Sequence, residues 1–141
     1  MGQREIVLAG LSPAGCAHYT PVQVQKLFFL IDREVSSEIS GPQFQFEPYN
    51  YGPFDPAVCH VLDSLTEEGL VEKGQQYKWQ TYGLTPAGRQ EGEQILKSLS
   101  PAAQNFMARA SAFVRKLSFT ELVSAIYKAY PEMRANSVFQ G

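Results

Sequence analysis

Cysteine and histidine are scarce in this sequence of 141 residues, which contains two of each. The four residues are Cys16, His18, Cys59 and His60. Zinc ligands of one site are usually separated by roughly two to four residues, whereas Cys59 and His60 are neighbours in a predicted helix and point about 100° apart. We therefore expect two reduced thiols, no metal site and no other cofactor.

Long hydrophobic runs are also absent. The longest apolar run, Leu27–Ile31, has five residues, and a helix that spans a bilayer needs about 20. The beginning of the sequence does not form a secretory signal, because its apolar part, Ile6–Leu11, is short and Glu5 follows Arg4. These absences predict a cytoplasmic protein.

An excess of basic residues is missing as well, since the formal net charge is −2. The charge is unevenly distributed: residues 1–73 hold four basic and ten acidic side chains, and residues 74–141 hold eight basic and four acidic ones. A protein that binds nucleic acid without selectivity is usually strongly basic. The charge distribution therefore does not favour that class of protein.

Catalytic motifs are not found either. The sequence has no Gly-x-Ser-x-Gly element and no phosphate-binding loop between a strand and a helix. Asp32 and Glu34 would point about 160° apart on a helix and are expected to be solvated. Glu47, Asp55 and His60 could converge near Gly52, which one sequence cannot test. We expect a protein that is not an enzyme.

What the sequence does contain is a series of helix starts, each with a capping residue followed by proline. These pairs are Thr20-Pro21, Asp55-Pro56, Thr85-Pro86 and Ser100-Pro101. Together with the spacing of apolar residues they predict one domain with helices at 3–11, 21–35, 56–68, 86–99, 101–117 and 119–130. The second helix is apolar on most of its circumference and is therefore predicted to lie at the centre of the core.

Strands are predicted in two places. The alternation of Phe44 and Phe46 with glutamines indicates a short strand or extended segment. A β-hairpin is expected with strands at 70–72 and 77–84 and a turn at 73–76. The fold class is thus α+β and mostly α. It contains a winged-helix-like helix–β-hairpin unit within a core at about 20–98, and C-terminal helices at about 100–131.

The segment FEPYNYGPFDP, residues 46–56, contains four aromatic residues and three prolines. Its prolines restrict the preceding residues to extended geometry, and Gly52 can adopt a turn that other residues resist. The segment is therefore predicted to be a pre-ordered loop. Its aromatic residues either pack over the central helix or remain exposed for a partner.

The order KLFFLIDRE, then FEPYNYGPFDPAV, then a helix ending in GLV resembles the Panacea-type antitoxin domain, also called SocA-like. The matching elements are Lys26-Leu27-Phe28 and Tyr51-Gly52-Pro53. The resemblance implies a small non-enzymatic protein, often encoded beside a toxin that it neutralises and often associated with phage or mobile elements. It implies a protein partner, and the residues expected to bind it are Tyr49, Tyr51, Gly52, Pro53 and Phe54.

A winged-helix DNA-binding regulator is the alternative. Its recognition helix would be 56–68, which has no lysine or arginine and carries Asp63, Glu67 and Glu68. Those carboxylates would face the phosphates of DNA, which is repulsive. The DNA-binding residues of this alternative would be Lys73, Lys78 and Arg89, and a homodimer through the helices at 101–130 stays open.

Overall fold

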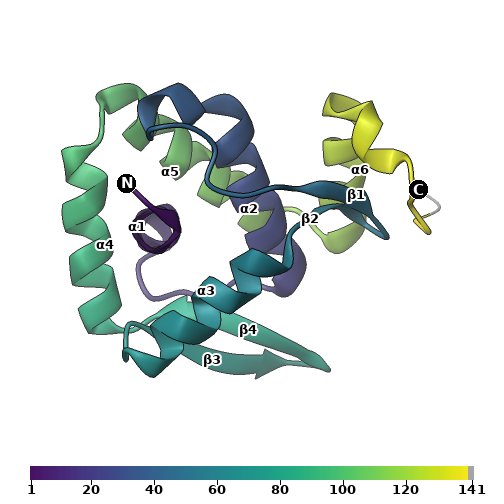
Figure 1. Cartoon of the computed structure of the whole chain (residues 1–141). Helices are drawn as coiled ribbons and strands as arrows, with labels where there is room; N and C mark the ends of the chain where they lie inside the picture. Colours follow the sequence, from purple (N-terminus) through teal and green to yellow (C-terminus); the bar gives the residue numbers. More distant parts are fainter. Residues whose placement is uncertain (140–141) are drawn as a thin grey trace.

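The computed structural model describes residues 1–139, which form six α-helices and two small antiparallel hairpins (Figure 1). This confirms the predicted class, α+β and mostly α. The helices are α1 (Gln3–Leu11), α2 (Pro21–Glu34), α3 (Pro56–Glu67), α4 (Pro86–Ser98), α5 (Pro101–Lys116) and α6 (Phe119–Ala129). The strands are β1 (Glu47–Tyr49), β2 (Gly52–Phe54), β3 (Val71–Gln76) and β4 (Trp79–Leu84). Short 3-10 turns lie at Ser12–Ala14, Ser36–Glu38 and Pro131–Arg134.

The predicted helix starts are confirmed by their capping hydrogen bonds. The hydroxyl of Thr20 accepts from the backbone N–H of Gln23, and the carboxylate of Asp55 accepts from the N–H of Ala57 at 2.9 Å. Thr85, Ser100 and Ser118 cap α4, α5 and α6 in the same way. Each cap satisfies an amide that the helix itself leaves free, which is why these boundaries can be predicted from the sequence.

Helix α2 lies at the centre of the molecule, as its composition predicted. Figure 1 shows α4 at one side, α6 at the opposite side and α2 between them. All residues from Val24 to Asp32 are buried. Packing around α2 joins every helix to one hydrophobic core, which includes Leu8, Val58, Met107 and Leu122.

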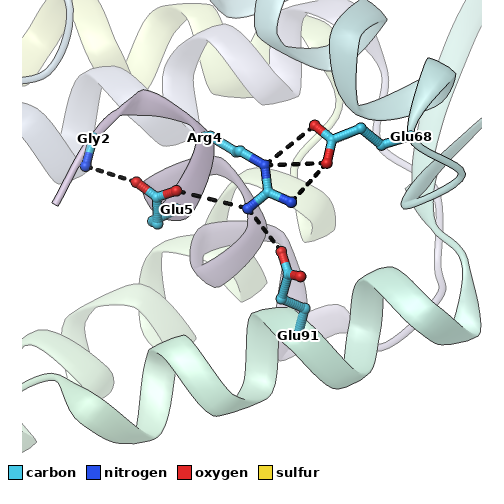
Figure 2. Close-up of polar contacts among 5 residues, drawn as sticks. All are labelled: Gly2, Arg4, Glu5, Glu68 and Glu91. Atoms are coloured by element: carbon cyan, nitrogen blue, oxygen red, sulfur yellow. Dashed lines mark hydrogen bonds and ion pairs between the residues drawn. The ribbon is translucent and has the colours of Figure 1, made fainter.

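Helix α4 packs against its neighbours through glycines. A Cβ at Gly92 would lie 2.5 Å from the carbonyl oxygen of Leu8 in α1, and one at Gly88 would lie 1.9 Å from that of Leu70. Arg4 of α1 strengthens the same contact region, because its guanidinium forms ion pairs with Glu68 at 2.7 Å and Glu91 at 2.9 Å (Figure 2). The backbone of α4 can approach the carbonyl groups of Leu8 and Leu70 this closely only because positions 88 and 92 lack side chains.

The β3–β4 hairpin is present, but the predicted turn at 73–76 is wrong. The strands pair from Val71↔Leu84 to Gln76↔Trp79, so the turn consists of Tyr77 and Lys78. The polar composition of residues 73–76 is typical of a turn, but these residues, Gly74 included, lie within β3. A Cβ at Gly74 would lie 2.9 Å from the ring of His18, and one at Gly83 would lie 2.4 Å from it. The glycines thus accommodate His18 and do not mark the turn.

The second hairpin, β1–β2, was not predicted, and residues 43–46 belong to no strand. Their amides bind carboxylates and not a neighbouring strand. The N–H groups of Gln43 and Phe44 donate to Asp32, and that of Gln45 donates to Asp55 at 2.7 Å. Those bonds satisfy the backbone without a strand partner, which the alternation of aromatic residues cannot reveal.

The C-terminal part of the described chain crosses the β1–β2 hairpin. The backbone N–H of Val138 donates to the carbonyl of Asn50 at 3.0 Å, and Asn136 donates to the carbonyl of Pro48 at 3.2 Å. Ser137 also donates to Asn50. The hairpin is therefore supported from α2 on one side and from this segment on the other. None of the helices formed by residues 1–139 has the length and apolar character needed to cross a membrane.

Candidate functional site

A cavity of about 550 Å³ opens where five segments meet: the start of α2, the β1–β2 hairpin, the end of β3 with the start of β4, the end of α5 and the start of α6. Its volume lies within the range of sites that bind small molecules or side chains, roughly 300–1,000 Å³. The residues that line it are Thr20, Pro21, Val22, Gln23, Gln25, Lys26, Tyr49, Asn50, Tyr51, Gly52, Phe54, Gln76, Trp79, Arg115, Leu117, Ser118, Phe119 and Leu122. We call it the aromatic cavity.

The aromatic cavity collects exposed hydrophobic side chains. Seven large hydrophobic residues are exposed within residues 1–139, and four of them line the cavity: Tyr49, Tyr51, Trp79 and Phe119. Tyr49 is 53% exposed and Trp79 is 44% exposed. Exposed apolar side chains scattered singly are ordinary, whereas a cluster of them around one depression is typical of interaction sites.

The aromatic rings are held in pairs by their neighbours. Tyr49 stacks on Phe54 with ring centres 5.2 Å apart, and Tyr51 meets Phe119 edge to face at 5.1 Å. Phe119 also contacts Phe139 at 6.2 Å. Because such pairs prefer these geometries, the rim of the cavity is ordered before any partner arrives.

The charge nearest the interior of the cavity belongs to Lys26 on α2. Its side chain is 3% exposed, and no hydrogen bond or ion pair reaches it from the other described residues. Burial disfavours the charged form and lowers the pKa of Lys26 to about 7. An unpaired lysine this buried is costly to the fold, which is unusual for a residue without a functional role.

The wall of the cavity is positive and contains no carboxylate. Lys26 and Arg115 are the two charged residues that line it. The first turn of α2 also contributes through Thr20, because a helix N-terminus carries a partial positive charge. At the start of α6 that charge is offset by the carboxylate of Glu121, which accepts from the N–H of Ser118. The cavity thus combines an apolar surface with the electrostatics of an anion site.

The five residues predicted to bind a partner lie in two layers. Tyr49 and Tyr51 are exposed, Phe54 is half-buried, and Gly52 and Pro53 are buried. Gly52 has a φ of +107°, a conformation that favours glycine, which agrees with the turn expected there. The tyrosines form the surface, and the Gly-Pro pair holds the hairpin against α2.

The three residues of the DNA-binding alternative lie in different electrostatic surroundings. Lys73 pairs with Asp63 of α3 at 2.6 Å, and Arg89 pairs with Glu93 at 2.7 Å. Lys78 is exposed at the tip of the β3–β4 hairpin. Asp63 and Glu67 are exposed on α3, and Glu68 is exposed at its C-cap, where it pairs with Arg4. The helix that would enter the DNA groove therefore presents an acidic surface.

Residues 1–139 contain no group of three or more histidine, cysteine, aspartate or glutamate side chains that could hold a metal ion. His18 contacts the hydroxyl of Thr81 at 2.8 Å, and His60 is exposed. Cys59 accepts a long hydrogen bond of 3.9 Å from Gln25, and burial raises the pKa of its thiol. The carboxylate of Asp55 is occupied by backbone amides, as described above.

Comparisons with protein-family models, curated proteins and solved structures find no match to this chain.

Lys26, Trp79, Arg115 and Phe119 are among the residues of the cavity that the sequence did not assign to the site. Lys26 could have been noticed, because a lysine within a helix that is apolar on most of its circumference has no solvent-facing side to occupy. Trp79 and Phe119 carried no comparable indication. They reach the cavity only because the β3–β4 hairpin and α6 fold toward the same side of α2.

Proposed function

We propose that this protein is a non-enzymatic interaction module that binds a partner protein through the aromatic cavity. The observation that carries the proposal is the gathering of Tyr49, Tyr51, Trp79 and Phe119 around one depression. Tyrosine and tryptophan are enriched among residues that dominate protein–protein binding energy. In keeping with the resemblance of its motifs, we propose that it acts as an antitoxin, neutralising or escorting a toxin encoded nearby.

The electrostatics support a protein partner over DNA. Lys73 of the helix–hairpin unit is paired with Asp63, and Arg89 of α4 is paired with Glu93. Phosphate contacts supply much of the affinity for DNA, and α3 offers carboxylates at that place. The layout of α3 followed by β3–β4 is the one feature that favours the alternative, a winged-helix regulator, and fold alone does not determine function.

Affinity purification from cells that naturally produce the protein tests the proposal. Tagged wild-type protein, Tyr51→Ala and Tyr77→Ala would be compared. Tyr77 is the matched control, since it is 85% exposed but does not line the cavity. We expect one stoichiometric protein to accompany the wild type and Tyr77→Ala and to be lost from Tyr51→Ala. Recovery of specific DNA fragments without that protein would overturn the proposal in favour of the regulator.

A further inference from the structure

The structure points to the chemistry of the partner: we infer that the aromatic cavity receives an acidic peptide segment, whose carboxylate pairs with Lys26 while its apolar part lies between the aromatic rings. This inference rests on the proposed function, because it assigns the partner's anchor to the same cavity. It is carried by the position of Lys26, the charges of the wall and the shape of the β1–β2 hairpin.

Charge complementarity is the first step. Lys26 is almost completely buried and has no partner among residues 1–139, yet it lines an open cavity. The wall adds Arg115 and the start of α2, and none of the residues that line it is acidic. A buried ammonium is stabilised when an opposite charge reaches it. The missing component is therefore an anion supplied from outside.

Access to the ammonium is the second step. A Cβ at position 52 would lie 3.3 Å from the Nζ atom of Lys26 and 3.4 Å from its Cε atom. Any side chain there would crowd the ammonium. Because residue 52 is glycine, the hairpin packs beside Lys26 without a side chain against the ammonium, and Lys26 remains part of the cavity lining.

The nature of the anion is the third step. A lysine ammonium is a point charge that can pair with a carboxylate or a phosphate. Phosphate sites commonly use free backbone amides at a helix start, but here Thr20 and Ser118 already accept from the amides of Gln23 and Glu121. Tyr49, Tyr51 and Trp79 at the entrance favour an apolar group next to the charge. An aspartate or glutamate beside a hydrophobic side chain has both features, and a strand of nucleic acid carries its charge without the apolar part.

Two small molecules, one charged and one uncharged, test whether the cavity requires a carboxylate. The protein has a single tryptophan, Trp79, whose fluorescence reports occupation of the cavity. We would titrate 4-phenylbutyrate and its uncharged analogue 4-phenylbutanamide at pH 6. The carboxylate is expected to bind about tenfold more tightly than the amide or better, as charged hydrogen bonds allow. Lys26→Met should remove that difference, and Lys128→Met, at an exposed lysine outside the cavity, should retain it.

A displayed library of random short peptides tests the peptide assignment. Peptides selected on the wild type should be enriched in aspartate or glutamate beside aromatic or aliphatic residues, and selection on Lys26→Met should lose the acidic preference. Circular dichroism would establish that Lys26→Met is folded. Equal binding of the two small probes, or an acidic preference that survives in Lys26→Met, would overturn the inference. So would displacement of the carboxylate by inorganic phosphate at concentrations where acetate has no effect.

Different results would contradict the inference about the carboxylate and the proposed function. If a partner protein is captured by the wild type and equally by Lys26→Met, but not by Tyr51→Ala, the inference about the carboxylate is wrong and the proposed function stands. If no protein is captured and no peptide is selected, the proposed function is wrong.

Discussion

Lys26 of α2 and Gly52 of the β1–β2 hairpin lie side by side, such that a Cβ at position 52 would stand 3.3 Å from the ammonium nitrogen. They belong to the two sequence motifs on which the family resemblance is based. In the fold these motifs form one unit: the helix supplies a buried cation, and the glycine lets the hairpin lie beside it. The predictions below test this unit and the packing that supports it.

Replacing Lys26 by methionine is expected to stabilise the protein at pH 6. The pKa of Lys26 is about 7 in the folded protein, against 10.5 for a lysine side chain in the unfolded chain. Below pH 7 both states are protonated, and the folded state bears the full cost of the buried charge. We expect Lys26→Met to raise the free energy of unfolding by roughly 2–4 kcal/mol, measured by urea denaturation.

The same comparison has a defined pH dependence. Between pH 7 and 10.5 the unfolded wild type binds more protons than the folded form, so its stability should rise with pH over this window. Lys26→Met lacks this contribution, and the gap between the two proteins should narrow from pH 6 to pH 9. Lys128→Met, at an exposed site, should follow the wild type. Parallel curves for the wild type and Lys26→Met would show that burial does not lower the pKa of Lys26.

The affinity for a carboxylate should fall with rising pH, whereas the stability of the wild type should rise. The affinity for 4-phenylbutyrate is expected to fall as pH rises through about 7, because the ammonium loses its proton while the ligand stays ionised. Tryptophan fluorescence titrations from pH 6 to 8.5 measure the effect. A flat profile would contradict the role given to Lys26.

Substitution of Gly52 by alanine is expected to destabilise the protein by about 1–3 kcal/mol. Two causes combine: the φ of +107°, and the contact of a new Cβ with Lys26 and the ring of Tyr127. Gly41→Ala measures the effect of the backbone conformation alone, since Gly41 has a φ of +97° and an added Cβ there would have nothing within 4 Å. Thermal unfolding should show a larger loss for Gly52→Ala. Equal losses would mean that the contact with Lys26 is unimportant.

Gly92→Ala should also be destabilising, by about 1–3 kcal/mol, because the new Cβ would lie 2.5 Å from the carbonyl oxygen of Leu8. Helix propensity alone predicts the opposite, since alanine is favoured over glycine inside a helix by about 1 kcal/mol. Gln90→Ala, at an exposed position of α4, is the control and should be neutral or stabilising. Chemical denaturation decides between the two signs.

Most of the helical framework could be predicted because its information is local. Thr20, Asp55 and Ser118 sit where their side chains can bind free amides a few residues later, whatever the rest of the chain does. The turn of the β3–β4 hairpin could not be predicted, since Gly74 makes room for His18, which comes from a distant segment. The β1–β2 hairpin was missed for a similar reason: its approach is held by the carboxylates of Asp32 and Asp55.

The sequence by itself determined the helices, the fold class and the aromatic Tyr-Gly-Pro segment, because caps, periodicity and proline act over a few residues. Only the tertiary structure decided that Lys26, Tyr51, Trp79 and Phe119 share one cavity. That arrangement depends on how four separate elements pack around α2, and packing energies between distant segments leave no periodic pattern in the chain. The burial of Lys26 is likewise a property of the assembled core, and it is the feature from which the chemistry of the partner follows.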